Sequence, residues 1–191
     1  MADIVLTGDT SGSITVAAPA VAGSNTLTLP ATTGNIVTTG DSSTITQGMI
    51  ASNVAGTGPV FRAYTTVTQT GVAASTQTKV LFPTEEFDIG GNFASSRFTA
   101  PIDGYYHFSA SVHIVGAQGL PQTTLYVNGA IKVYGNIQQV STNDNVSPNL
   151  SAIVYLNAGD YAEVYTYSTN ASSFFGNSSL TWFSGFLVRG A

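Results

Sequence analysis

Two histidines and two adjacent glutamates are the residues of this sequence whose types could support catalysis. His107 and His113 lie on the same face of one predicted strand, and Glu85 and Glu86 are adjacent in FPTEEFD. A catalytic triad needs a nucleophile and a carboxylate beside the histidine, and no nucleophile-elbow pattern is present. A glycosidase needs two carboxyl groups roughly 5 to 9 Å apart across a cleft, whereas adjacent strand residues point to opposite sides, so we interpret the two glutamates as a solvated loop. The sequence predicts no enzyme.

Ligands for a metal or another cofactor are equally sparse in the sequence. The chain has no cysteine, and Asp103, Asp144 and Asp160 are scattered rather than grouped in a calcium-binding loop. No cofactor is predicted. The two histidines are interpreted as structural or interfacial, and at an interface they could make assembly sensitive to pH, because imidazole titrates near neutrality.

The charge balance of the chain restricts its partners. Only 8% of the residues are charged, with five Lys or Arg against ten Asp or Glu and a net charge of −5. Nucleic acid and anionic membranes require a basic surface, so neither is expected as a partner. The first residues lack the basic and apolar regions of a signal peptide, and no apolar run approaches the roughly 18 residues of a membrane span. We expect neither export by this route nor membrane insertion.

The chain divides into two regions of different composition. All ten Phe, all nine Tyr and the one Trp follow Gly58, and 43% of the whole chain is hydrophobic. Residues 1–58 hold only short β-branched pieces, at 14–16, 26–29 and 35–38, and one possible short helix at 43–53. Such short pieces leave backbone groups unpaired, so we expect residues 1–58 to interlace with copies of themselves or to lie on a partner.

Residues 59–191 carry the pattern of an all-β domain. Runs rich in Val, Phe, Tyr and Thr recur between breaks rich in Gly, Pro and Asn. A jelly roll or another β-sandwich of eight to ten strands is the expected fold.

Several of these strands have two faces that differ in chemistry but are both unsuited to free solvent. In GYYHFSASVHIV the residues from Tyr106 to Ile114 at alternate positions are apolar and predict the core, while the opposite face begins with Tyr105 and His107. The strands at 161–167 and 181–188 repeat this arrangement. Mixed aromatic and polar faces are typical of protein interfaces. The residues predicted for a subunit interface are Tyr105, His107, His113, Tyr165, Tyr167 and Phe183.

Three long loops rich in amides, at 116–122, 134–149 and 168–179, form a second candidate site. Amides and hydroxyls beside aromatic rings can bind carbohydrate, and loops on a rigid sandwich often carry binding residues. The alternative is that these loops only solubilise the domain, with their phenylalanines against the core or a neighbour. The candidate binding residues are Tyr134, Asn136, Gln138, Asn170, Phe174 and Phe175.

Four sequence blocks resemble one family. FTAPIDGYYHF at 98–108, LYVNG at 125–129, LNAGD at 156–160 and FSGFLV at 183–188 resemble, in this order, the signature blocks of the globular head of complement 1q and its tumour-necrosis-factor-like relatives. The resemblance implies a jelly-roll head that forms a homotrimer, with the inner sheet of each subunit facing the threefold axis. No collagen-like Gly-X-Y repeat precedes the head, unlike in the animal relatives.

The stretches at 12–39 and 45–64 resemble the segments that precede such heads in bacteriophage tail fibres and other phage structural proteins. This resemblance implies a virion surface protein, made in the host cytoplasm, whose residues 1–58 trimerise and bind other virion proteins. Two versions stay open. In the first, the head is the tip of a short tail-fibre-like spike and binds host-surface glycans. In the second, the chain decorates the capsid as a head-fibre or cement protein, residues 1–58 bind the coat, and the trimeric head projects from the shell.

Overall fold

The computed structural model of the protein describes residues 4–7, 13–16 and 58–191. The chain divides into two compact units, Met1–Ile45 and Thr46–Ala191. In the first unit, β1 (Ile4–Thr7) pairs antiparallel with β2 (Ser13–Val16), so the predicted strand at 14–16 is confirmed and finds its partner within the same chain. The strands expected at 26–29 and 35–38 and the short helix at 43–53 lie outside the described residues. The boundary at residue 58 stays a prediction.

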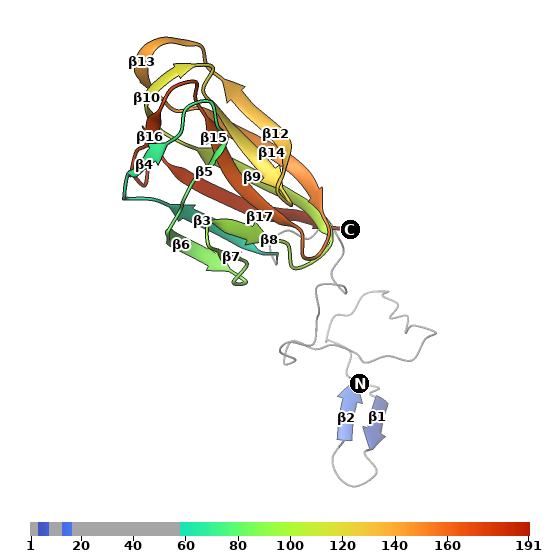
Figure 1. The fold of residues 1–191 in the computed structure, drawn as a ribbon. Coiled ribbons are helices and arrows are strands. Elements are labelled where there is room, and N and C mark those ends of the chain that lie inside the picture. The colour runs from blue at the N-terminus through green and yellow to red at the C-terminus, as the bar shows by residue number, and fades with distance from the viewer. Residues whose placement is uncertain (1–3, 8–12, 17–57) are drawn as a thin grey trace, which may run out of the picture. The chain divides into compact units, whose positions relative to one another are not determined.

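Residues 58–191 form three antiparallel sheets and no helix, as the sequence predicted (Figure 1). The five-stranded sheet has the order β14 (Asn149–Leu156), β9 (Gly104–Ser111), β17 (Trp182–Gly190), β3 (Val60–Tyr64) and β6 (Thr84–Ile89). The six-stranded sheet has the order β12 (Ala130–Ile137), β11 (Gln122–Val127), β15 (Tyr161–Tyr167), β8 (Arg97–Thr99) and β7 (Phe93–Ala94), and β5 (Thr78–Lys79) also pairs with β15. The end sheet has the order β13 (Val140–Val146), β10 (Ile114–Gly119), β16 (Ser172–Phe174) and β4 (Gln69–Val72).

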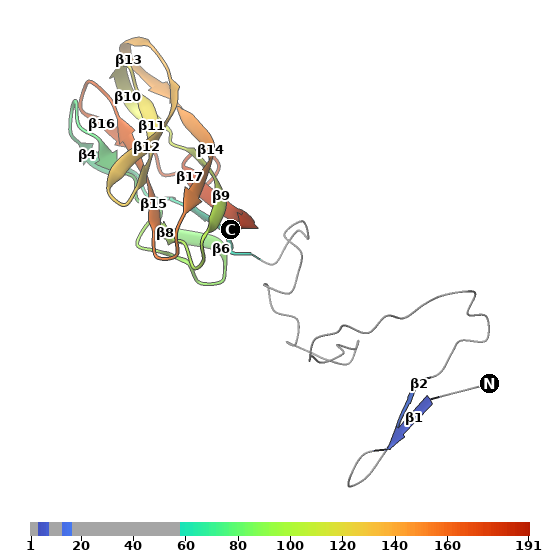
Figure 2. The ribbon, with the colours of Figure 1, turned by 90° about the vertical axis from the view of Figure 1, so that its right-hand side faces the viewer.

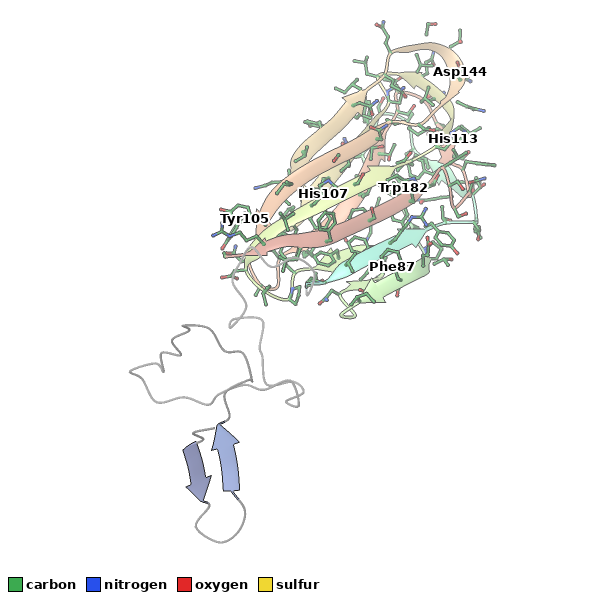
Figure 3. The ribbon with its side chains drawn as sticks, turned by 180° about the vertical axis from the view of Figure 1, so that it is seen from behind. Phe87, Tyr105, His107, His113, Asp144 and Trp182 are labelled. Carbon is green, nitrogen blue, oxygen red and sulfur yellow. The ribbon has the colours of Figure 1, made fainter. Side chains whose placement is uncertain are left out.

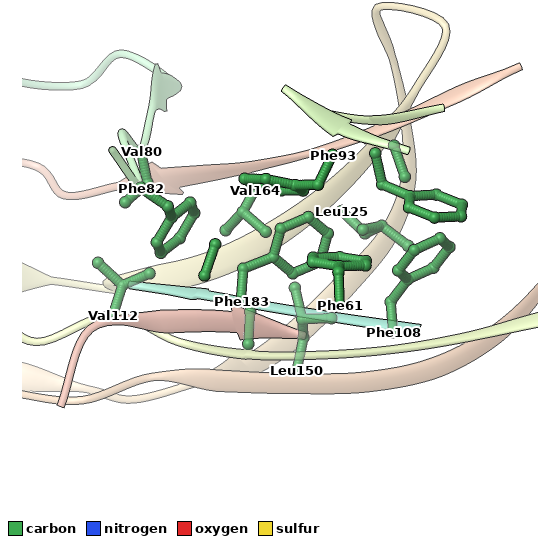
Figure 4. Packing of buried hydrophobic residues seen from close by; sticks show 14 of the residues in the cluster. Phe61, Val80, Phe82, Phe93, Phe108, Val112, Leu125, Leu150, Val164 and Phe183 are labelled. Atoms are coloured by element: carbon green, nitrogen blue, oxygen red, sulfur yellow. The ribbon is translucent and has the colours of Figure 1, made fainter. Parts of the chain in front are cut away.

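The five-stranded and six-stranded sheets face each other and enclose an aromatic core (Figures 2 and 4). The ring of Phe61 stacks on Phe93 and Phe98 with centroids 4.7 and 5.1 Å apart, and meets Phe183 edge-on at 4.9 Å. Aromatic pairs in such geometries add about 0.5–1.5 kcal/mol to the stability gained from burial. The core therefore depends on rings that follow Gly58 in the chain, as the composition indicated.

The alternation predicted for β9 is confirmed. Tyr106, Phe108 and Ala110 are fully buried, as are Val112 and Ile114 beyond the end of the strand. The Tyr106 hydroxyl donates to the Ile102 carbonyl at 2.8 Å, which satisfies the polar end of that buried ring.

The prediction that Phe183 lies at a subunit interface is wrong. Phe183 pairs with Ala110 of β9 and its side chain is fully buried in the core. Gly185 pairs with Phe108 and lies on the same face of β17 as Phe183. A Cβ atom at Gly185 would lie 2.6 Å from the Phe108 ring and 2.8 Å from the Phe61 ring. The missing side chain at Gly185 thus makes room for these rings, and the core face of β17 is the one that contains Phe183.

The head has two distinct ends. Residues 58 and 59 enter beside the end of β17, where the Leu187 amide donates to the Pro59 carbonyl at 3.0 Å, and Gly190 of β17 pairs with Gly104. The end sheet lies at the opposite end of the sandwich (Figure 1). The chain therefore enters and leaves the head at one end, and the end sheet is remote from both points.

Candidate assembly face

The outward side of the five-stranded sheet carries exposed aromatic and aliphatic side chains. Directly paired residues of neighbouring strands point to the same side of a sheet. Tyr105 pairs with Tyr155, and His107 pairs with Ile153. The exposed fractions are 47% for Tyr105, 40% for Tyr155 and 59% for Ile153, and the two tyrosine rings meet edge-on at 5.4 Å. This half of the sheet thus presents apolar area where a solvated sheet would present polar residues.

The same apolar character continues across β17 and β6. Phe186 pairs with His107 on one side and with Val60 on the other, and Val60 in turn pairs with Ile89. Phe186 is 45% exposed and Ile89 is 61% exposed. Figure 3 labels Phe87 of β6, Tyr105 and His107 of β9, and Trp182 of β17 on this face. We call this surface the assembly face; its main residues are Phe87, Ile89, Tyr105, His107, Ile153, Tyr155, Trp182, Phe186 and Val188.

Arg62 and Glu86 form an ion pair across the strands of this face. The Arg62 guanidinium also lies 5.8 Å from the Tyr64 ring centroid and 5.9 Å from that of Trp182, and it donates to the Ser178 carbonyl at 3.0 Å. An arginine held among aromatic rings, with few other charges, matches the composition of protein interface cores.

Glu85 and Glu86 occupy a strand, β6, rather than the solvated loop that the sequence suggested. Both side chains are exposed, because β6 is the edge strand of the five-stranded sheet. Glu85 pairs with the buried Ala63 and lies on the core side of this edge, whereas Glu86 lies where the β3–β6 pairing shifts register and contacts Arg62. The two carboxyl groups therefore share one exposed strand.

The two histidines lie in different surroundings. The His107 ring contacts Phe186 with centroids 5.1 Å apart, and its Nε2 lies 3.0 Å from the Ser151 hydroxyl. His113 lies beyond the end of β9, where its Nδ1 is 2.8 Å from the Ser147 hydroxyl. Hydroxyls and rings surround both imidazoles, and no described hydrogen bond joins either one to a carboxylate. His107 belongs to the assembly face, and His113 lies closer to the end sheet (Figure 3).

Tyr165 and Tyr167 do not share a face with Tyr105 and His107, so the six predicted interface residues do not form one surface. Both tyrosines lie on β15 of the six-stranded sheet, on the opposite side of the sandwich. Their predicted alternation is nevertheless correct, since Ala162, Val164 and Thr166 are fully buried. Sequence alternation assigns a residue to the outside of a strand, but it does not say which sheet the strand joins.

The predicted loop site is only partly exposed. Phe174 is 1% exposed and belongs to the core, which contradicts its place in a binding loop, whereas its neighbour Phe175 is 38% exposed. Phe174 pairs with Ile114 in the end sheet and so turns inward. Tyr134 is 52% exposed but lies on strand β12, not in a loop.

The amides of this predicted site hold the fold together. The Asn170 side chain donates to the Gly116 carbonyl and, at 2.9 Å, to the Asn143 side chain. The Asn136 side chain accepts from the Asn149 amide at 2.6 Å. Gln138 is partly buried, and its backbone N–H donates to the Pro121 carbonyl at 3.2 Å. These bonds leave less of the amide chemistry free for a ligand than the sequence suggested.

Sequence reasoning missed several residues of the assembly face. Ile153 and Tyr155 belong to NLSAIVYL, where the buried residues Leu150, Val154 and Leu156 share one parity and the exposed residues the other. That alternation was available in the sequence. Phe87 and Ile89 were hidden by the irregular pairing of β6.

The described residues hold neither a metal-binding cluster nor a helix that could span a membrane. No group of three or more His, Cys, Asp and Glu residues there could hold a metal ion. Within the same part of the chain, no helix has the length and apolar character needed to cross a membrane.

Comparison with known proteins gives one consistent result. The sequence model of the C1q domain matches residues 62–188, more than half of the chain. The globular domain of zebrafish complement 1qA is similar with a TM-score of 0.51 at 15% identity, covering 71% of this chain and 100% of that one.

Two further solved structures have the same fold. Murine APRIL at pH 5.0 has a TM-score of 0.55 at 12% identity, covering 69% of this chain and 99% of that one. Eiger TNF from S. frugiperda has a TM-score of 0.51 at 10% identity, covering 70% of this chain and 94% of that one. No curated protein sequence matches the chain.

Proposed function

Because the chain belongs to the C1q domain family, we propose that it is a non-enzymatic homotrimer whose copies join through the assembly face. The observation that carries this proposal is the exposed apolar area on the outward side of the five-stranded sheet, where Ile89, Ile153 and Phe186 are 45–61% exposed. Exposed apolar patches rimmed by polar residues mark interaction sites. A second copy that covers this face would remove the apolar area from water.

The arrangement of the two ends of the head fits a role in presenting a binding surface. Residues 58 and 59 enter at one end, and the end sheet with Phe175 lies at the other (Figure 1). A head attached through residue 58 would therefore carry its end sheet at the end remote from the attachment point. The resemblance of the stretches at 12–39 and 45–64 to segments of phage tail fibres supports a virion as the platform. In this role residues 1–58 bind other virion proteins and the exposed head binds host-surface glycans.

A capsid-decoration protein is the second candidate, and the length of residues 1–58 favours it. Even a fully extended segment of 58 residues spans at most roughly 190 Å, which suits attachment close to a shell. In this version the same trimeric head projects from the coat.

A density map of the intact phage particle that contains this chain tests the virion role. A threefold density of the size of three heads on the tail would support the spike, and the same density on the shell would support decoration. Absence of the chain from purified particles would contradict both versions. The trimer itself is tested separately in solution.

A further inference from the structure

The outward side of the six-stranded sheet carries five of the nine tyrosines of the chain, and we call it the tyrosine face: Tyr126, Tyr134, Tyr161, Tyr165 and Tyr167. Thr124 pairs with Tyr134 on one side and with Tyr165 on the other, so these three residues form one row across the sheet. Tyr126 pairs with Glu163 in the adjacent row. The rings of Tyr126 and Tyr165 stack with centroids 4.0 Å apart and an interplanar angle of 29°.

The residues beneath these rings are buried although they point outward. Thr124 is fully buried and Glu163 is 3% exposed. Both phenols are protonated at neutral pH, as tyrosines ordinarily are, and burial raises the pKa of Tyr126 and Tyr165 further. The Tyr165 hydroxyl donates to Glu163 Oε2 at 3.5 Å. A stacked, supported pair of rings loses little freedom when a ligand binds, which favours affinity.

Two cations border the rings and share one carboxylate. Lys79 Nζ and Arg97 Nε lie 2.7 and 2.8 Å from Glu163 Oε1, and the Arg97 guanidinium lies 3.8 Å from the Tyr161 ring centroid. Arg97 keeps 42% of its side chain exposed. These contacts fix the positions of both cations, and one positive charge of the trio is not neutralised by Glu163.

This local charge contrasts with the rest of the chain. The net charge of the protein is −5, with only five Lys or Arg. Three of the five, Lys79, Arg97 and Lys132, lie on strands of the six-stranded sheet. Exposed charges separated by more than about 8 Å are largely screened at physiological salt, so a bound group senses the local excess of positive charge.

We propose that the tyrosine face binds an acidic saccharide, with sugar rings on Tyr126, Tyr134 and Tyr165 and the anionic group near Arg97. The flat C–H side of a pyranose ring complements a tyrosine ring, and sugar hydroxyls complement the phenols. Its carboxylate or sulfate complements the guanidinium, which keeps N–H donors free of Glu163. The face lies on the opposite side of the sandwich from the assembly face, so it stays open in a trimer. The proposal rests on the proposed glycan-binding role and moves the site from the end of the head to its side.

Binding of the full-length protein to an immobilised panel of oligosaccharides tests this site. The panel holds uronate-, sialate- and sulfate-bearing members, with malto- and chito-oligosaccharides as neutral counterparts. We expect binding to acidic members that weakens as salt is raised. Tyr134→Ala, which removes a half-exposed ring, should weaken that binding at least tenfold, and Arg97→Gln should abolish the preference for acidic members. The matched control is Phe175→Ala at the end sheet, which should leave binding unchanged.

Three results would overturn the proposal: no acidic member binds, neutral members bind equally well, or Phe175→Ala abolishes binding while Tyr134→Ala does not. Thermal unfolding of each variant shows whether it is folded, and a variant that fails is replaced by Tyr126→Phe, which keeps the ring. That substitution should weaken binding less than tenfold by removing one phenol. Light scattering on the same samples reports the trimer independently, so failure of the sugar site and failure of the trimer are distinguishable.

Discussion

The two outward faces of the sandwich differ in how much of each is covered by side chains of the same subunit. On the assembly face, Ile153 is 59% exposed and Ile89 is 61% exposed. On the tyrosine face, the outward-pointing residues Thr124 and Glu163 are buried under rings of the same chain. The outward faces of two sheets that share one core can thus differ in their exposure to solvent. The assembly face needs a partner chain to cover its apolar residues, whereas the tyrosine face is covered by rings of its own chain.

The difference concerns charge as well as exposure. The Arg62–Glu86 pair of the assembly face lies at its β3–β6 side, and on β14, β9 and β17 the exposed apolar residues alternate with serines, with Arg189 beside Tyr105. The tyrosine face instead places the trio of Lys79, Glu163 and Arg97 beside its rings. Charges that would be costly to bury in a subunit interface are tolerable on a face that remains in water.

The largest expected effect comes from two phenylalanines three positions apart on β17. Phe183→Ala should lower the free energy of unfolding by about 3–5 kcal/mol because it leaves a cavity in the core. Phe186→Ala should change it by about 0.5 kcal/mol or less in the isolated subunit, because that ring is half exposed. Chemical denaturation of dilute protein measures both values. Equal losses for the two variants would contradict the assignment of their faces.

A second, smaller effect is expected on the tyrosine face. Glu163→Gln removes the carboxylate that Lys79 and Arg97 share, and it should lower the free energy of unfolding by about 1–2 kcal/mol, since both cations are partly exposed and regain water. Trimer mass should not change. Denaturation and light scattering of the same sample test both statements, and dissociation of the trimer would show that the two faces are not independent.

The difference in stability between wild type and Glu163→Gln is also expected to depend on pH. Burial opposes ionisation of Glu163, but the hydrogen bonds and charges of Lys79 and Arg97 outweigh it and hold the Glu163 pKa below the ordinary value of 4.5. A lowered pKa contributes stability above the ordinary value, and the contribution disappears as pH falls through the lowered one. The stability difference between wild type and Glu163→Gln should therefore be constant above pH 5 or so and shrink in acid. A difference that grows in acid would contradict the ion pairs.

A loss of stability similar to that of Glu163→Gln, with no effect on either outward face, is expected at the end sheet. Asn170→Ala removes hydrogen bonds to Gly116 and Asn143 and should cost about 1–2 kcal/mol of stability, with no change in trimer mass or in saccharide binding. Thermal unfolding and the oligosaccharide panel measure these quantities. Loss of binding with unchanged stability would restore the end of the head as the ligand site.

Much of this architecture was predictable from the sequence, because alternation reports which side of a strand is buried. The core side of β9 was predicted residue by residue from Tyr106 to Ile114. Phe183 was placed wrongly because Trp182, Phe183 and Phe186 put rings on both sides of β17, so hydrophobicity alone does not choose between them. The residue that decides is Gly185, whose missing side chain marks the crowded core side.

The candidate sites were harder to predict because they depend on contacts between distant segments. The sequence places Tyr165 outside the core, but only the pairing of β15 with β11 shows that it stacks on Tyr126, on the side away from Tyr105. Phe174 and Phe175 are neighbours, and the pairing of β16 with β10 decides which one is buried. Register between strands far apart in sequence is not contained in local alternation.

The most direct test of the account is the mass of the full-length protein in solution beside two matched variants. Tyr105 and Tyr134 are 47% and 52% exposed on opposite faces, so an aspartate at either position costs little within the subunit. Light scattering should give three times the 19.7 kDa chain mass for wild type and for Tyr134→Asp, and a single chain mass for Tyr105→Asp with its β-sheet spectrum intact. A monomeric wild type, or a trimer that survives Tyr105→Asp, would contradict assembly through the five-stranded sheet.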